Sequence, residues 1–223
     1  MKKVAVLTGA GISQESGLAT FRGAGGLWNG ESIEEVATLQ GFKRNPAKVL
    51  DFYNQRRKEL LSAKPNAAHR ALKDLETAYE VSIITQNVDD LHERAGSKFI
   101  IHLHGELLKV RSVVEPSEIM PWVCDLTLED RDSQNRPLRP HIVWFGEAVP
   151  EMERAVSIVE RADYLLVIGT SLAVYPAADL IHYASKQAKI YLVDPHPAIV
   201  PLGIEIIAQK ATQGVPRLVK SLL

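Results

Sequence analysis

The segment Thr8–Gly17 (TGAGISQESG) constrains the fold of this 223-residue chain more than any other. The preceding residues Lys3–Leu7 have the length and apolar content of a buried parallel strand. Gly9 and Gly11 allow a tight turn, and serines that can cap a helix start follow them, so backbone N–H groups would be presented to a phosphate. We therefore expect a nucleotide site. The alternative is a plain glycine turn between strand and helix, because Gln14 stands where the usual dinucleotide fingerprint has its third glycine.

The composition narrows the classes of protein to which the chain can belong. With 26 basic and 27 acidic residues the net charge is −1, so direct binding to nucleic acid or to an anionic membrane is not expected. No window approaches the roughly 20 apolar residues of a membrane span, and the first strand follows Met1 too closely for a signal peptide. Cys124 is the only cysteine, which excludes an intramolecular disulfide and a multi-cysteine metal site. We expect a cytoplasmic protein.

Strand and helix signals alternate along the rest of the chain, which predicts a doubly wound parallel (Rossmann-like) α/β sheet. Residues 107–140 are polar, contain four prolines and lack periodicity, so they are expected to form a small module outside this sheet. The expected strands are 81–85, 99–103, 141–145, 164–168, 190–193 and 203–207, and the expected helices are 46–61, 66–78, 88–95, 150–161, 177–186 and 215–222.

Polar clusters follow three of the expected strands. They are residues 85–89 (TQNVD), 169–171 (GTS) and 194–196 (DPH). Each one alone is typical of a turn with a helix cap. Ligands of open α/β sheets bind at the carboxyl ends of the strands, so three clusters at the edge that also carries the glycine loop favour a binding site.

Two histidines, His102 and His104, are candidates for a general base. Imidazole titrates near neutrality and can accept a hydroxyl proton at physiological pH. Both would lie on one face of a strand by its two-residue period, so spacing does not choose between them. The alternative for either histidine is a hydrogen-bonded structural role.

Residues 9–28 closely resemble the NAD-binding signature of the sirtuins, the NAD-dependent protein-lysine deacylases. The resemblance implies one catalytic domain, 1–223, with small-module insertions at about 29–65 and 107–140. It also implies NAD as cofactor, acylated-lysine proteins or peptides as substrates, and nicotinamide and O-acyl-ADP-ribose as products. The alternatives are ADP-ribosyl transfer or NAD hydrolysis at the same site, or a non-catalytic module that senses NAD or binds peptides.

The resemblance assigns roles to individual residues. His104 is implied as the catalytic base, because the histidine of the family motif directly precedes glycine, and Asn87 as a second catalytic residue. Phe21 would shield the reaction from water, and Asp194 stands where the family usually has asparagine. The implied NAD-binding residues are Gly9, Ala10, Gly11, Ser13, Thr20, Phe21, Arg22, Trp28, Gln86, Asn87, Asp89, Gly169, Thr170, Ser171, Asp194, Pro195, His196 and Ala211.

The substrate side of the site is also implied by the resemblance. Tyr53 and Arg56, three residues apart on a helix, match the pair that binds acidic acyl groups in sirtuins that remove succinyl or malonyl groups, and Ala37 matches the small residue that widens their pocket. The alternative is a solvated basic helix face, because Arg57 and Lys58 follow. The residues implied to sandwich the peptide are Val143, Phe145, Gly146 and Val174, with ordinary sheet core as the alternative.

The chain departs from the family at the structural zinc. The four positions that usually hold cysteine are occupied by Ser112, Glu115, Arg131 and Gln134, none of which is a typical zinc ligand. We therefore expect no metal, and a 107–140 module that is either held by packing around Trp122 or mobile.

Overall fold

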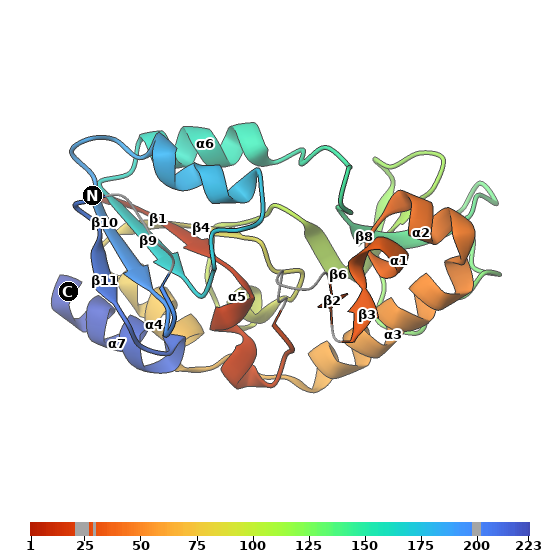
Figure 1. Cartoon of the computed structure of the whole chain (residues 1–223), viewed down its shortest axis with the longest axis horizontal. Coiled ribbons are helices and arrows are strands. Elements are labelled where there is room, and N and C mark those ends of the chain that lie inside the picture. The colour runs from red at the N-terminus through yellow and green to blue at the C-terminus, as the bar shows by residue number, and fades with distance from the viewer. Residues whose placement is uncertain (21–26, 29, 198–201) are drawn as a thin grey trace.

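The computed structural model describes residues 1–20, 27–28, 30–197 and 202–223 of the chain. It has two parts, one built on a parallel sheet and one built from helices and short antiparallel strands (Figure 1). None of the described helices combines the length and the apolar character that crossing a membrane requires.

The parallel sheet has six strands in the order β11-β10-β9-β1-β4-β5, which confirms the predicted α/β fold. In the central strand β1, Val6 lies opposite Ile83 of β4 on one side and Leu166 of β9 on the other. The chain passes from β1 to β4 on one side and returns to β9 on the other, so the carboxyl end of β1 is a topological switch point. The strands are β1 (Lys3–Thr8), β4 (Glu80–Thr85), β5 (Ile100–His102), β9 (Tyr164–Ile168), β10 (Lys189–Val193) and β11 (Glu205–Ile207).

Helices cover both faces of the sheet, because successive side chains of each strand point to opposite faces. Val4 and Val6 pack with helices α4 (Ala67–Leu75) and α7 (Ala211–Leu222). Their neighbours Ala5 and Leu7 pack on the other face with α6 (Met152–Glu160) and the 3-10 helix η3 (Ala177–Tyr183). Figure 1 shows α6 along one side of the sheet and α4 with α7 along the other.

The second part has an antiparallel sheet in the order β7-β6-β8, against which one of its helices packs, and two shorter helices pack on that helix. Helix α3 begins with a proline in its first turn, and the side chain of Asn45 caps it by accepting from the backbone N–H of Lys48. The elements of this part are the hairpin strands β2 (Leu27–Trp28) and β3 (Glu31–Ser32), helices α1 (Ile33–Val36), α2 (Leu39–Arg44) and α3 (Pro46–Ser62), and strands β6 (Gly105–Ser112), β7 (Ile119–Pro121) and β8 (Leu138–Ile142).

Several elements differ from the sequence prediction. Two short 3-10 helices, η1 (Ala10–Ile12) and η2 (Gln14–Ser16), replace the helix expected after the glycine turn, and the side chain of Ser13 caps neither. The helix expected at 88–95 is reduced to α5 (Leu91–Arg94), and η3 is a 3-10 helix. The strand expected at 141–145 is shifted toward the N-terminus and is β8 (Leu138–Ile142), which pairs with β6.

Candidate active site

A cavity of about 870 Å³ lies at the carboxyl edge of the parallel sheet. Residues that follow β1, β4, β9 and β10 form one wall, and residues of α3 and of segment 143–147 form another. This is the switch point, where ligands of open α/β sheets bind. The volume is within the range of pockets for small molecules and cofactors.

Every predicted site residue that the structure describes lines this cavity. Phe21 and Arg22 lie outside the described residues. Other residues that were not among the predicted site residues also line the cavity, among them Glu59, Glu147 and Lys210. The predicted residues that line it are Gly9, Ala10, Gly11, Ser13, Thr20, Trp28, Ala37, Tyr53, Arg56, Gln86, Asn87, Asp89, His104, Val143, Phe145, Gly146, Gly169, Thr170, Ser171, Val174, Asp194, Pro195, His196 and Ala211.

The two glycine-containing loops of the rim contact each other through their backbones. The N–H of Gly11 donates to the carbonyl oxygen of Gly169 at 2.8 Å. A Cβ atom on Gly11 would lie 2.7 Å from the Cα of Gly169, and Gly169 itself has a φ of +62°. Larger residues would therefore separate the loops after β1 and β9.

Ser13, Asn87 and Asp89 form a buried hydrogen-bond network at the rim. The hydroxyl of Ser13 donates to Oδ2 of Asp89 at 2.8 Å and accepts from Nδ2 of Asn87 at 3.2 Å. Oδ1 of Asp89 accepts from the N–H of Leu91 at 3.1 Å. Burial raises the pKa of Asp89, although the bonds from Ser13 and Leu91 oppose the shift. The network holds an amide and a carboxylate side by side, a suitable arrangement for polar ligand groups.

The structure separates the two candidate histidines. β5 ends at His102, so the expectation that both histidines share one face of a strand was wrong. His104 lines the cavity, and its Nδ1 lies 2.9 Å from the carbonyl oxygen of Gln86. Since a carbonyl only accepts, Nδ1 carries the hydrogen and Nε2 is the basic nitrogen. Burial lowers the pKa of His104, opposed by the Gln86 bond, so its imidazole is neutral at pH 7.

Both ring nitrogens of His102 form hydrogen bonds within the protein. Its Nδ1 is 3.1 Å from the carbonyl oxygen of Asn87, and its Nε2 is 2.7 Å from Oε1 of Glu93. Burial would lower the pKa of His102, but the hydrogen bond and charge of Glu93 outweigh it and raise the pKa. These contacts support a structural role.

One group of described residues could supply three metal ligands: Glu93, His102 and Glu106, whose ligand atoms lie within 4.8 Å of one another. Each carboxylate already has a hydrogen-bond partner within the protein. Glu93 pairs with His102, and Glu106 accepts from Nζ of Lys109 at 2.6 Å.

Ser112 and Glu115, two of the four positions that the resemblance aligns with zinc cysteines, form hydrogen bonds within the protein. The hydroxyl of Ser112 accepts from the backbone N–H groups of Val114 and Glu115. Close by, the guanidinium of Arg136 binds Asp132 at 2.7 Å and also pairs with Glu118. The same module has a small apolar core, formed by Leu50, Val110, Leu126 and Leu138, with Trp122 packed against it.

Tyr53 and Arg56 of α3 line the cavity and are almost completely buried. The side chain of Arg56 is 9% exposed and Arg57 is buried, so the alternative of a solvated basic helix face was wrong for both. Nη2 of Arg56 lies 2.7 Å from Oε1 of Glu59. The Tyr53 hydroxyl accepts a hydrogen bond of 2.9 Å from the indole Nε1 of Trp144.

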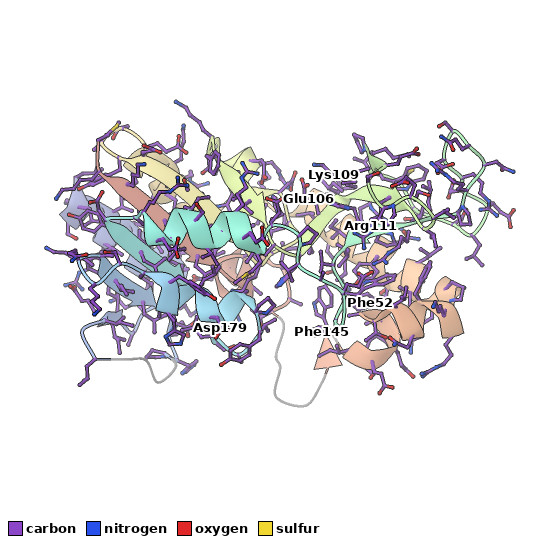
Figure 2. The ribbon with its side chains drawn as sticks, turned by 90° about the horizontal axis from the view of Figure 1, so that it is seen from above. Phe52, Glu106, Lys109, Arg111, Phe145 and Asp179 are labelled. Atoms are coloured by element: carbon purple, nitrogen blue, oxygen red, sulfur yellow. The ribbon has the colours of Figure 1, made fainter. Side chains whose placement is uncertain are left out.

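Segment 143–147 connects the two parts of the site. The N–H of Phe145 donates to the carbonyl of Ala37, and Trp144 is buried while Phe145 is 42% exposed. The carboxylate of Glu147 accepts from Arg139, Arg111 and the backbone N–H of Trp144. Figure 2 labels Phe145, Phe52 and Arg111 toward the part of the molecule that contains α3, and Asp179 on η3 in the part that contains the parallel sheet.

Comparisons with known proteins agree with this arrangement. The model of the Sir2 family matches residues 9–176. An "NAD-dependent protein deacylase" of Helicobacter pylori strain J99 is 54% identical over 225 residues, covering 100% of this chain and 96% of that protein. A protein of the same name from Bacteroides thetaiotaomicron is 51% identical over 231 residues, covering 100% of this chain and 99% of the relative.

Solved structures show the same fold. The crystal structure of a Sir2 homologue in complex with NAD superposes with a TM-score of 0.89 at 40% identity, covering 99% of this chain and 89% of that one. A structure of Sir2 bound to an acetylated peptide superposes with a TM-score of 0.81 at 29% identity, covering 98% and 92%.

Proposed function

The chain belongs to the Sir2 family, the sirtuins, and since it is therefore an NAD-dependent protein deacylase, we propose that it removes succinyl and malonyl groups, and also acetyl groups, from lysine side chains. The products would be free lysine, nicotinamide and O-acyl-ADP-ribose. One observation carries the acyl preference: Tyr53 and Arg56 line the same cavity as His104.

The chemistry of the rim fits NAD. The amide of Asn87 can pair with the nicotinamide carboxamide, and the carboxylate of Asp194 can accept from ribose hydroxyls. The glycine turn after β1 would receive the pyrophosphate. When bound, NAD supplies the ADP-ribosyl group that accepts the acyl group, with nicotinamide as the leaving group. By resemblance, Phe21 would exclude water.

His104 is proposed as the general base. Its Nδ1–H is held by the carbonyl of Gln86, which leaves Nε2 to accept the proton of a ribose hydroxyl. The lowered pKa keeps the ring neutral, and therefore able to accept a proton, at physiological pH. The buried network of Ser13, Asn87 and Asp89 would fix the orientation of the polar groups around this hydroxyl.

Arg56 is proposed as the group that selects acidic acyl chains. A guanidinium offers paired N–H donors to a carboxylate. Tyr53 adds a hydroxyl on the same face of α3, and the small side chain of Ala37 leaves room for the longer acyl group. The contact between Arg56 and Glu59 supports the assignment, since the arginine already binds a carboxylate in this structure.

The peptide is proposed to lie between segment 143–146 and Val174, as an added strand. Both line the cavity that His104 also lines. Pairing through main-chain groups depends little on side-chain identity. We therefore expect tolerance for many target sequences.

Mass spectrometry of matched peptides tests the proposal. Peptides carrying one succinyl-, malonyl- or acetyl-lysine are incubated with the protein and NAD, and the products are weighed. Arg56→Met should lower kcat/KM for desuccinylation about 10- to 100-fold, the value of a charge-assisted hydrogen bond, and deacetylation much less. Lys58→Met is the matched control, because Lys58 lies on the same helix but pairs with Asp125, outside the cavity.

The outcomes separate the possible functions. Equal losses on succinyl and acetyl substrates in Arg56→Met would refute the acyl preference. ADP-ribosylated peptide would indicate transfer to another nucleophile, and an unchanged peptide would indicate a non-catalytic module.

A further inference from the structure

The hydrogen bond between Trp144 and Tyr53 has a fixed direction. An indole Nε1–H is only a donor, so the Tyr53 hydroxyl must be the acceptor in this contact of 2.9 Å. A phenol hydroxyl that accepts one bond still has its own hydrogen to donate. Because Trp144 donates to it, the Tyr53 hydroxyl is left to act as a hydrogen-bond donor toward any further group.

The hydrogen of the Tyr53 hydroxyl has no acceptor among the described residues, although the side chain is fully buried. Within the described part of the chain, Trp144 is the only hydrogen-bond partner of this hydroxyl. Tyr53 lines the cavity and shares it with Arg56, one turn further along α3. Burial raises the pKa of Tyr53 despite the bond from Trp144, so the hydroxyl keeps its hydrogen at physiological pH.

The position of Trp144 is itself strongly determined. Its backbone N–H donates to Oε2 of Glu147 at 2.8 Å. The guanidinium of Arg139 lies over the indole ring, 3.4 Å from the ring centroid, and binds the same carboxylate. A cation over the ring face draws electron density from it and makes the N–H a better donor. The indole is therefore held at both its backbone and its ring.

We propose that Trp144 is a positioning residue for acidic acyl groups: its indole N–H occupies the acceptor side of the Tyr53 hydroxyl, so that this hydroxyl donates to the acyl carboxylate bound by Arg56. The inference rests on the proposed function and deepens it. An acetyl group has no carboxylate to accept this bond, so the effect of Trp144 is confined to acidic substrates.

The test compares desuccinylation and deacetylation in Trp144→Phe, Tyr53→Phe and the double variant. Phenylalanine keeps an aromatic ring at position 144 but removes the donor. We expect Trp144→Phe to lower the ratio of desuccinylation to deacetylation kcat/KM about ten-fold, the value of one hydrogen bond. Most of the loss should fall on KM for the succinyl peptide. Tyr53→Phe should give a similar ratio, and the double variant should be no worse than either single variant.

A packing control separates positioning from loss of structure. Phe42 contacts the ring of Trp144, with centroids 5.1 Å apart, but takes no part in the hydrogen bond. Phe42→Leu should lower stability in thermal unfolding while leaving the succinyl-to-acetyl ratio as in the parent protein. A change of ratio in this control as large as in Trp144→Phe would overturn the inference.

The same variants distinguish a failure of the inference about Trp144 from a failure of the proposed preference for acidic acyl groups. If Trp144→Phe lowers the ratio by the same factor in the parent protein and in the Tyr53→Phe variant, the inference about Trp144 is wrong while the acyl preference stands. If Arg56→Met and Tyr53→Phe also leave the ratio unchanged, the proposed preference for acidic acyl groups is wrong, and the inference falls with it.

Discussion

His104 and Gln86 are joined by a hydrogen bond of 2.9 Å between Nδ1 of the imidazole and the main-chain carbonyl oxygen. His102 makes the same kind of bond, at 3.1 Å, to the next carbonyl along the chain, that of Asn87. Two consecutive peptide groups are therefore held by two histidines, but only His104 also lines the cavity. This arrangement leaves Nε2 of His104 basic, as the proposed role of general base requires, while both ring nitrogens of His102 are already bound within the protein.

Replacement of the proposed base should abolish turnover and leave NAD binding intact. His104→Ala is expected to lower kcat about 10²- to 10⁴-fold, the usual contribution of a general base. Calorimetric titration should find NAD affinity close to that of the parent. The exposed His182 of η3 provides the control, since His182→Ala should change neither quantity. Retained deacylation in His104→Ala would contradict the assignment.

The pH dependence of deacylation should follow the lowered pKa of His104. The base works in its neutral form, so kcat/KM should be constant at neutral pH and fall as the pH drops through a value below 6.5. On the acid side the rate should fall about ten-fold per pH unit. Initial rates measured between pH 5 and pH 8 with a buffer series of constant ionic strength test this. An apparent pKa above that of ordinary histidine would contradict the dominant effect of burial on this ring.

Glu59 is expected to compete with the substrate for Arg56. Its carboxylate contacts Nη2 of Arg56 at 2.7 Å, and its side chain is 44% exposed. Because water reaches the Glu59 side of this ion pair, the pair is weak, so Glu59→Gln should lower KM for a succinylated peptide only about two- to five-fold. The control is Glu153→Gln on the exposed side of α6. A higher KM in Glu59→Gln would indicate instead that Glu59 holds Arg56 in place.

Asp132 is expected to stabilise the 107–140 module. Its Oδ1 accepts from the backbone N–H groups of Gln134 and Arg136, and its Oδ2 accepts from the Arg136 side chain. Burial would raise the pKa of Asp132, but these bonds outweigh it and lower the pKa to about 2. Asp132→Asn should speed cleavage within the module by trypsin, mapped by mass spectrometry. Asp125→Asn, which disrupts an exposed pair with Lys58, should not.

The fold should lose stability as the pH falls below neutrality because of His69 and its neighbour His92. Their rings are buried 4.9 Å apart, and burial, aided by Arg70, lowers the pKa of His69 to about 4. The unfolded chain then binds protons below about pH 6.5 that the native state does not, which favours unfolding. His69 alone should lower the free energy of unfolding by about 2 kcal/mol between pH 7.5 and pH 5.

Urea denaturation at several pH values measures how the free energy of unfolding changes with pH. His69→Gln is the informative variant, since a glutamine oxygen can still accept from the backbone N–H of Asn66, as Nδ1 of His69 does. In this variant the free energy of unfolding should depend less on pH than in the parent protein, whatever its value at neutral pH. An unchanged slope would mean that His69 does not contribute.

Elements with strong local signals were predicted well from the sequence. The strand at 164–168 has the expected bounds, because a continuous apolar run can only be a buried parallel strand here. The Asn66 cap of α4 is confirmed by its bond to the N–H of Ala68. The sheet of β6, β7 and β8 was missed, since β6 and β7 are only partly buried and the pairing of β6 with β8 joins residues far apart in the sequence.

The rim of the site was predictable because the carboxyl ends of neighbouring parallel strands must meet. The contacts of Glu59 and Glu147 were not, since they depend on how α3 and segment 143–147 face the same cavity. The single available hint was that Glu59 follows Arg56 by three residues on a helix. The direction of the bond between Trp144 and Tyr53 likewise depends on a contact between residues 91 positions apart.

The backbone contact between Gly11 and Gly169 limits how this enzyme can be redesigned. The backbones of the loops after β1 and β9 are in direct contact, so a side chain introduced at either glycine would collide with the other loop. An attempt to change the nucleotide that the protein accepts should therefore leave the glycines alone and begin at Asp194, at the end of β10, where the side chain is only half-buried.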